Sequence, residues 1–197
     1  MTTINRRLAL VSALAVAGCS SAPVPTDTFY RLRPASPPMR AGGALKGTAE
    51  VPPLRGEGII NERAILYRVS GTELKQYSYH FWADAPPALF QSELIAALRK
   101  AQAFDAVVKP ELRLNRDYEV IGHILKLEHD TAGGRSKAVV EIELAVRRVS
   151  DNRQAMAKSY AAEADAAGGS VAAGIDAFSE AFNRIAAAFV ADLAGIS

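Results

Sequence analysis

The helix predicted at the end of this sequence constrains the fold most, because its apolar face needs a large surface to pack against. Val171, Ile175, Phe178, Phe182, Ile185 and Phe189 recur at steps of 4, 3, 4, 3 and 4 residues, the spacing of one helical face. Ser170 is placed to cap this helix. Its only basic residue is Arg184, whereas helices that lie on membranes are rich in lysine and arginine. We therefore expect the apolar face to pack on a sheet.

Alternating apolar and polar residues predict that sheet. In the segment 138–149, Val140, Ile142, Leu144 and Val146 alternate with polar or small residues, which is typical of a strand with one wet face. Gly133-Gly134 forms the turn of a hairpin with a strand over 118–127. Further strands are predicted over 28–33, 45–54, 104–108 and 155–164, a second hairpin over 63–69 and 73–82, and an irregular loop over 34–43.

A second helix is predicted after Asp84, which we expect to cap it, with Pro86-Pro87 in the first turn. Phe90, Leu94, Ala97, Leu98 and Ala101 fall on one face. The chain has 197 residues, 49% of them hydrophobic, enough for one core of ordinary size. The sequence thus predicts a single globular domain.

The first 18 residues have the organisation of a secretory signal. Arg6 and Arg7 precede the apolar run 8–17, and Gly18-Cys19 follow. A run of about ten residues is too short for a helix across a bilayer, which needs roughly 20 residues.

Val16-Ala17-Gly18-Cys19 resembles the bacterial lipobox. That resemblance implies a signal peptide over 1–18, cleavage before Cys19, a diacylglyceryl thioether on Cys19 and a third acyl chain on its new amino group, more than the two signals that stable anchoring needs. The alternative is that Cys19 is an ordinary small residue near a cleavage site. Ser20 and Ser21 in place of aspartate resemble the sorting rule for the outer membrane, so we expect a periplasmic, lipid-anchored location in a Gram-negative bacterium. The segment 19–27 contains two prolines and small polar residues, which is typical of an extended tether.

Charge and cysteine content exclude several functions. Without Arg6 and Arg7, Lys+Arg falls from 23 to 21, equal to the 21 Asp+Glu. A neutral chain has no excess cations to release counterions from a phosphate backbone, so we expect no nucleic-acid partner. One cysteine forms neither an internal disulfide nor a multi-cysteine zinc site.

Motifs for catalysis, cofactors and metals are absent from the sequence. The glycines of 169–174 have P-loop spacing, but Ile175 and Asp176 stand where lysine and serine or threonine are needed. His123 and His129, with Glu128 between them, could share a strand face as a metal pair, yet they lack an obvious third ligand. We predict no metal, no cofactor and no catalytic residue, although a triad assembled from distant positions stays open.

The mature sequence resembles the ABC-type transport auxiliary lipoprotein family, the PqiC-like lipoproteins, over nearly its whole length. The resemblance is carried by four segments: 29–32 (FYRL), 62–68 (ERAILYR), 79–84 (YHFWAD) with the helix that follows, and the alanine-rich last helix. Phe81 stands where members often have arginine, and Gly56-Glu57-Gly58 replaces the usual proline-led turn.

This resemblance implies an α/β domain over 28–197 with three layers, a mixed, largely antiparallel sheet and two main helices, related to the N-terminal fold of TolB. It also implies partners: a periplasmic MCE-domain protein with its ABC permease and ATPase, in a system that moves phospholipids or other hydrophobic molecules between membranes. A homo-oligomeric ring is an extension that sequence does not test. We take Arg68, Tyr79 and Trp82 as candidate interface residues, because these types are enriched among interface anchors; Trp82 could equally be a core residue.

Three alternatives stay open at this point. The chain could be an assembly or pilot lipoprotein for another outer-membrane machine. It could be a lipid-anchored enzyme, in which case a histidine should have a serine, carboxylate or metal neighbour in a cleft. It could itself carry lipid, in which case an apolar pocket is expected.

Overall fold

The computed structural model describes residues 25–33 and 45–196. Among them no helix is long and apolar enough to cross a membrane. In chain order the elements are β1 (Thr28–Tyr30), β2 (Leu45–Glu50), β3 (Arg55–Gly56), η1 (Gly58–Asn61), β4 (Ala64–Ser70), β5 (Glu73–Trp82), α1 (Pro86–Ala101), β6 (Phe104–Val108), η2 (Pro110–Leu112), β7 (Tyr118–Asp130), η3 (Ala132–Gly134), β8 (Lys137–Arg148), β9 (Gln154–Asp165) and α2 (Val171–Leu193).

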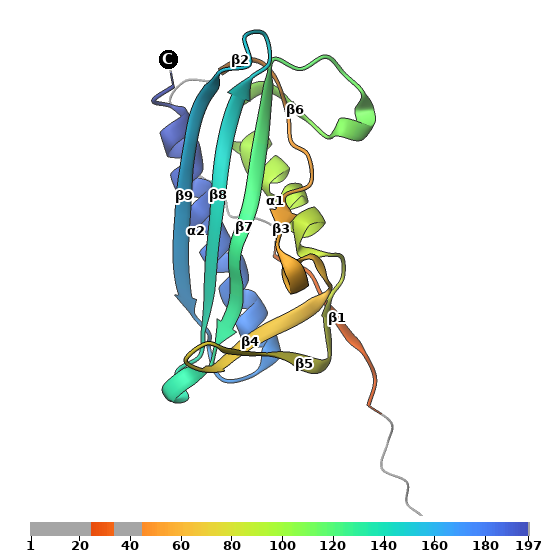
Figure 1. Ribbon diagram of the computed structural model, residues 1–197, viewed down its shortest axis with the longest axis vertical. Helices are drawn as coiled ribbons and strands as arrows, with labels where there is room; N and C mark the ends of the chain where they lie inside the picture. The colour runs from red at the N-terminus through yellow and green to blue at the C-terminus, as the bar shows by residue number, and fades with distance from the viewer. Residues whose placement is uncertain (1–24, 34–44, 197) are drawn as a thin grey trace, which may run out of the picture.

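Strand β7 is the central strand of one mixed sheet (Figure 1). One edge of β7 pairs antiparallel with β8 along its length, and β8 pairs antiparallel with β9. The other edge pairs parallel with three short strands in succession: β2 at Tyr118 and Glu119, β3 at His123 and Ile124, and β4 at His129 and Asp130. β5 extends the sheet beside β4, β1 lies beside β5, and β6 lies beside β2. The backbone of 45–70 therefore runs along β7 and pairs with it at intervals.

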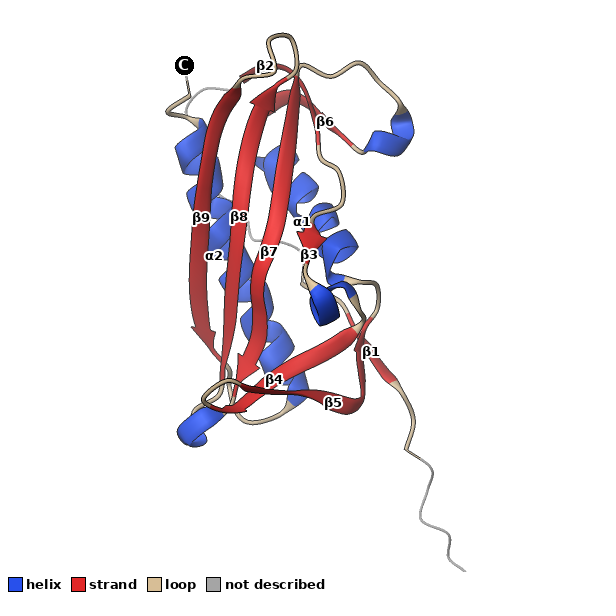
Figure 2. Ribbon diagram, viewed as in Figure 1, coloured by secondary structure: helices blue, strands red, loops and turns tan. Residues whose placement is uncertain are grey.

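Both helices pack on the same side of the long strands (Figure 2). The apolar face of α2 is buried between the sheet and α1, as its spacing predicts. Edge-on ring contacts join the layers: Phe182 meets Phe90 of α1 at 4.9 Å between centroids, and Phe178 meets Trp82 at 5.5 Å. The expected α/β class with a mixed sheet and two main helices is confirmed.

Most predicted elements are present, and three expectations need correction. The strand predicted over 28–33 ends at Tyr30. Asp84 is not the cap of α1: the helix begins at Pro86, and the N-cap residue Ala85 makes no side-chain cap bond. Proline at the first position has a preset φ and no N–H to satisfy, which replaces much of what a cap supplies. The strand predicted over 45–54 ends at Glu50, because the chain leaves the ladder at Val51-Pro52-Pro53 and returns only as β3. Ser170 does cap α2, accepting from the Ala173 amide at 3.1 Å. The loop predicted over 34–43 lies outside the described residues.

Gly122 allows the chain between β2 and β3 to pack closely on β7. A Cβ at position 122 would lie 2.5 Å from Leu54 Cγ and 3.1 Å from Leu144 Cδ2, and Leu54 is 2% exposed. We predict that Gly122→Ala lowers the free energy of unfolding by about 1–3 kcal/mol, the usual cost of overpacking. Urea denaturation measures it.

The matched test is a double-mutant cycle with Leu54→Ala. Since the clash involves Leu54, Leu54→Ala should lower the free energy of unfolding less in the Gly122→Ala background than in the wild type. Strict additivity of the two costs would contradict this assignment.

Candidate partner interface

The structure separates the residues that the sequence suggests as interface anchors. Trp82 is 1% exposed and packs on Phe178, so it is a core residue and is withdrawn as a surface contact. Tyr79 is 47% exposed on β5, with a left-handed φ of 62° that is unusual for an aromatic residue. Arg68 lies toward the other end of the β4–β5 hairpin, where it pairs with Leu74 in register. Cys19 lies outside the described residues.

A β-bulge at Leu125 decides which side chains of β7 face outward. The pairing with β8 is regular up to Ile124–Ile142 and resumes at Lys126–Glu141, so Leu125 is the extra residue. A bulge reverses the alternation of side chains along a strand. Before it, Ile121 and His123 lie on the outer face, away from the helices; after it, Lys126 and the even-numbered residues do.

The bulge therefore places the two histidines of β7 on opposite faces. His123 is half-exposed on the outer face with Glu57 3.8 Å away, whereas His129 is 1% exposed on the inner face, under Gly174 of α2. The spacing of six residues suggested a shared face, and that geometry is wrong because it counts no bulge. In the part of the chain that the structure describes, no group of three potential metal ligands exists.

An apolar groove of about 520 Å³ lies on the outer face beside the bulge. Three of its lining residues are large exposed aliphatics from three elements: Ile59 of η1 is 42% exposed, Leu74 of β5 47% and Leu125 of β7 42%. Leu66 and Leu127 form part of its lining, and the exposed Lys126 and Glu57 border it. Large apolar side chains gathered in an exposed depression are typical of an interaction site. We call this feature the bulge groove.

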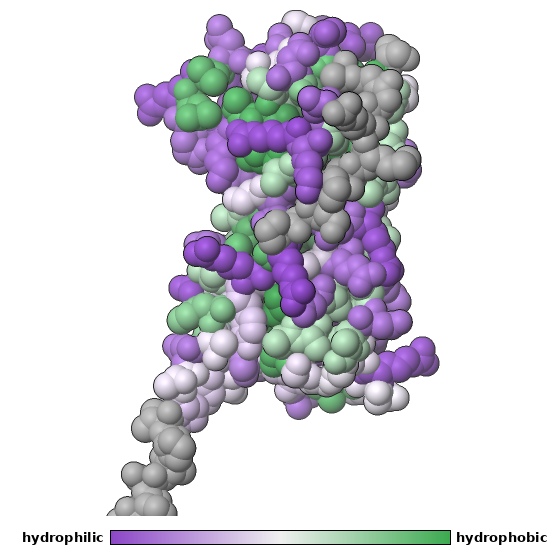
Figure 3. Space-filling model, turned by 180° about the vertical axis from the view of Figure 1, so that it is seen from behind, coloured by the Kyte–Doolittle hydropathy of each residue, from purple (hydrophilic) through white to green (hydrophobic). Residues whose placement is uncertain are grey.

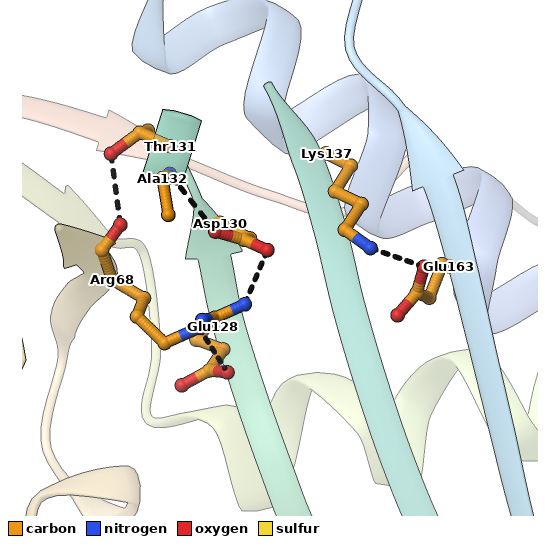
Figure 4. A network of polar contacts seen from close by, with 7 residues as sticks. All are labelled: Arg68, Glu128, Asp130, Thr131, Ala132, Lys137 and Glu163. Carbon is orange, nitrogen blue, oxygen red and sulfur yellow. Dashed lines mark hydrogen bonds and ion pairs between the residues drawn. The ribbon is translucent and has the colours of Figure 1, made fainter. Parts of the chain in front are cut away.

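A charged cluster of Arg68, Glu128 and Asp130 (Figure 4) adjoins the bulge groove, which Glu128 helps to line. Arg68 Nε lies 3.3 Å from Glu128 Oε1, and the same guanidinium pairs with Asp130. The two carboxylate residues are only 7% and 6% exposed. Thr131 donates to the Arg68 carbonyl through its amide at 3.0 Å and its hydroxyl at 2.9 Å. These bonds tie the β4–β5 hairpin to the end of β7.

An adjoining depression of about 460 Å³ shares Leu74, Lys126 and Glu128 with the bulge groove and extends to Val139 and Glu163. Lys137 of β8 and Glu163 of β9 form an ion pair at 2.5 Å on the same face. The outer face therefore offers a continuous surface that is aliphatic at one end and charged at the other.

His129 has a serine neighbour, which bears on the enzyme alternative. The Ser136 hydroxyl donates to the Gly168 carbonyl at 2.9 Å, so it accepts from His129 Nε2 at 2.8 Å. His129 Nδ1 then accepts from the Tyr77 hydroxyl at 2.9 Å. Because Nε2 carries the proton, it is not a base toward Ser136. The arrangement links β5, β7 and the chain before α2 rather than activating a nucleophile.

Comparison with known families matches residues 30–190 to the model of the ABC-type transport auxiliary lipoprotein component. Comparison with curated proteins gave no match.

Solved structures share the fold at low sequence identity. Protein XCC0632 from Xanthomonas campestris, of the DUF330 family, has a TM-score of 0.77 at 20% identity, covering 85% of this chain and 96% of that one. An uncharacterized protein has a TM-score of 0.65 at 11% identity, covering 84% and 97%. The hypothetical protein CT253 from Chlamydia trachomatis has 0.52 at 14%, covering 77% and 98%. These likenesses establish the fold.

We predict that Arg68→Met lowers the free energy of unfolding by roughly 2–4 kcal/mol, because it leaves two buried carboxylates without their cation. The cost is below that of a fully buried pair since the Arg68 side chain is 28% exposed. Urea denaturation measures the change. Lys137→Ala, which breaks an ion pair whose glutamate is 57% exposed, is the control and should cost under about 1 kcal/mol. Equal costs for the two variants would refute the assignment.

A second prediction concerns pH. Burial lowers the pKa of His129, with Asp130 opposing the shift. The folded protein therefore excludes a proton that the unfolded chain takes up below pH about 6.5, so stability is present above that pH and is lost as the pH falls. Compared with His129→Gln, the wild type should lose up to about 1.4 kcal/mol more per pH unit between pH 6.5 and 5. Parallel pH profiles of the unfolding free energy would contradict this. His80 and His123 are present in both proteins and cancel.

Proposed function

This chain belongs to the ABC-type transport auxiliary lipoprotein component family, and from that premise we propose that it is the outer-membrane docking component of an MCE-type transport system. The family is one of auxiliary lipoproteins of ABC-type transport. Lipidated Cys19 would hold the domain at the periplasmic face of the outer membrane. The system would move phospholipids or other hydrophobic molecules between the membranes, with an ABC permease and an ATPase at its other end.

The observation that carries the proposal is the bulge groove. Ile59, Leu74 and Leu125 expose a large aliphatic surface on a sheet whose other side is filled by two helices and their aromatic side chains. A filled core supports a rigid adaptor more than a carrier with an internal lipid cavity. The groove fits an apolar segment of the MCE-domain partner, with Lys126 beside it to meet an acidic residue.

Tyr79 and Arg68 keep different roles in this proposal. The exposed Tyr79 remains a candidate contact, whereas Arg68 acts by holding Glu128 and Asp130 at the end of the groove. A ring of several copies, presenting several grooves around one partner, is compatible with the proposal and is not required by it.

Site-specific photocrosslinking in cells tests the proposal. We expect a photoreactive residue at position 74 or 125 to crosslink an MCE-domain protein, identified by mass spectrometry, and Cys19→Ala to abolish the product. Position 112 is the matched control, because Leu112 is 57% exposed but lies outside the groove. Leu125→Asp should reduce crosslinking from position 74 by about tenfold or more, since it buries a charge at an apolar contact.

The outcomes separate the remaining alternatives. Capture of a different outer-membrane machine from positions 74 and 125, without an MCE protein, would favour the assembly-factor function. Crosslinks to phospholipid alone would favour lipid carriage by the groove. Equal capture of the MCE protein from position 112 would move the docking site away from the groove.

A further inference from the structure

An exposed aromatic group lies where the chain enters the domain. Phe29 of β1 is 54% exposed, and its ring lies 6.0 Å from that of Phe81 on the neighbouring strand. The Arg63 guanidinium sits 4.8 Å from the Phe29 centroid. Arg63 Nε donates to the Trp82 carbonyl at 2.9 Å, which holds the cation over the ring. We call Phe29, Phe81 and Arg63 the entry patch.

Tyr79 adds a second exposed aromatic residue to this end of the domain. It directly precedes the three β5 residues that pair with β1, and its positive φ is maintained despite the strain that such a backbone imposes on an aromatic residue. Seen from behind, pale and light green atoms, which are weakly polar or apolar, lie together with some hydrophilic ones at the lower left of the domain (Figure 3). Water-facing aromatics from two strands therefore lie close to the tether.

The length of the tether limits how far this patch can be from the membrane. Eight residues, 20–27, lie between Cys19 and Thr28, and an extended proline-rich chain spans roughly 3 Å per residue. A lipidated Cys19 would thus keep Phe29 within about 30 Å of the bilayer surface. Other large exposed side chains are under no such restraint. Leu112, for example, is in η2 directly after β6, and β6 lies at the opposite end of the domain from β1 (Figure 1).

We infer that the entry patch is a membrane-contact site, in which Phe29 and Phe81 enter the headgroup region of the phospholipid leaflet that holds the anchor. This inference rests on the lipidated Cys19 of the proposed function. Aromatic rings favour the membrane–water interface, and arginine can keep its charge among headgroups while its stem lies on apolar atoms. The contact would fix the orientation of the domain, which attachment of lipid at Cys19 alone does not set.

Nearby charges indicate which lipids the patch needs. The exposed cations Arg31 and Arg63 are balanced by the exposed acids Asp27 and Glu62. A balanced surface gains little from an anionic membrane, so the rings supply the contact. Binding of the patch is therefore expected to be independent of the anionic lipid fraction and of salt.

Fluorescence quenching by brominated lipid tests the inference. The lipidated full-length protein, carrying Phe29→Trp or Leu112→Trp, is reconstituted into phosphatidylethanolamine and phosphatidylglycerol vesicles that contain phosphatidylcholine brominated along its acyl chains. Trp82 is 1% exposed and supplies the same background in wild type and variants. Near-ultraviolet circular dichroism establishes that both variants fold. We expect Phe29→Trp to lose most of its added fluorescence and Leu112→Trp to lose none.

Flotation of the same vesicles separates two kinds of failure. If the protein does not float with lipid, the anchor fails and both the proposed function and this inference fall. If it floats but Phe29→Trp is unquenched, or is quenched no more than Leu112→Trp, the anchor stands and the entry patch is not a membrane contact. Quenching that disappears at high salt or without phosphatidylglycerol would also overturn the aromatic contact, in favour of electrostatic adsorption.

Discussion

The rest of the structure depends on the pairing of both edges of β7. One edge is occupied by β8 along the whole strand, and the other by β2, β3 and β4 in succession. A central strand with both edges hydrogen-bonded has a fixed register. A shift by one residue would move all of its buried apolar side chains to the solvent-facing side. The short strands gain their positions from β7 rather than from their own length. Arg55 and Gly56 of β3, only two residues, form a strand for this reason.

The extra residue Leu125 determines which side chains lie on each face of β7. Beyond it, Glu128 and Asp130 meet Arg68 on the outside, while His129 turns inward to Tyr77 and Ser136. The inward histidine in turn requires a small residue on α2, since a Cβ at Gly174 would lie 2.8 Å from His129 Nδ1. Bulges often re-aim side chains beside functional sites. Here the bulged leucine itself becomes part of the apolar groove.

Much of the fold could be predicted from periodicity, because long elements repeat their pattern many times. The α2 stripe and the alternation of β8 each offer several consecutive matches, and both are buried as expected. Short elements such as β3 and η1 carry no such pattern, since tertiary pairing determines them. The parallel pairing of β7 with three separate strands joins residues far apart in the chain, and local patterns do not contain that information.

The candidate site was harder to predict, for a related reason. Trp82 is of a type enriched both in interfaces and in cores, and the residue type alone does not decide between them. Leu74 and Leu125 form the groove only because the bulge and the β4–β5 hairpin bring them to one face. The local pattern does not single out the bulge, because two pairs of adjacent apolar residues, Val120-Ile121 and Ile124-Leu125, interrupt the alternation of this strand.

The distribution of apolar surface supports the proposed adaptor more than a carrier with an internal lipid cavity. The interior is filled by interlocking rings, including Phe90 on Phe182 and Tyr160 on Phe189, so the domain holds its shape without a ligand. Its groove is instead open on the outer face, where a second molecule can enter without any rearrangement of the core. Because the domain is rigid, any contact that fixes its orientation near β1 also fixes the orientation of the bulge groove. The anchoring and docking that we propose would thereby be coupled through the β4–β5 hairpin, which has Arg63, just before β4, and Phe81 near one end and Arg68 and Leu74 near the other.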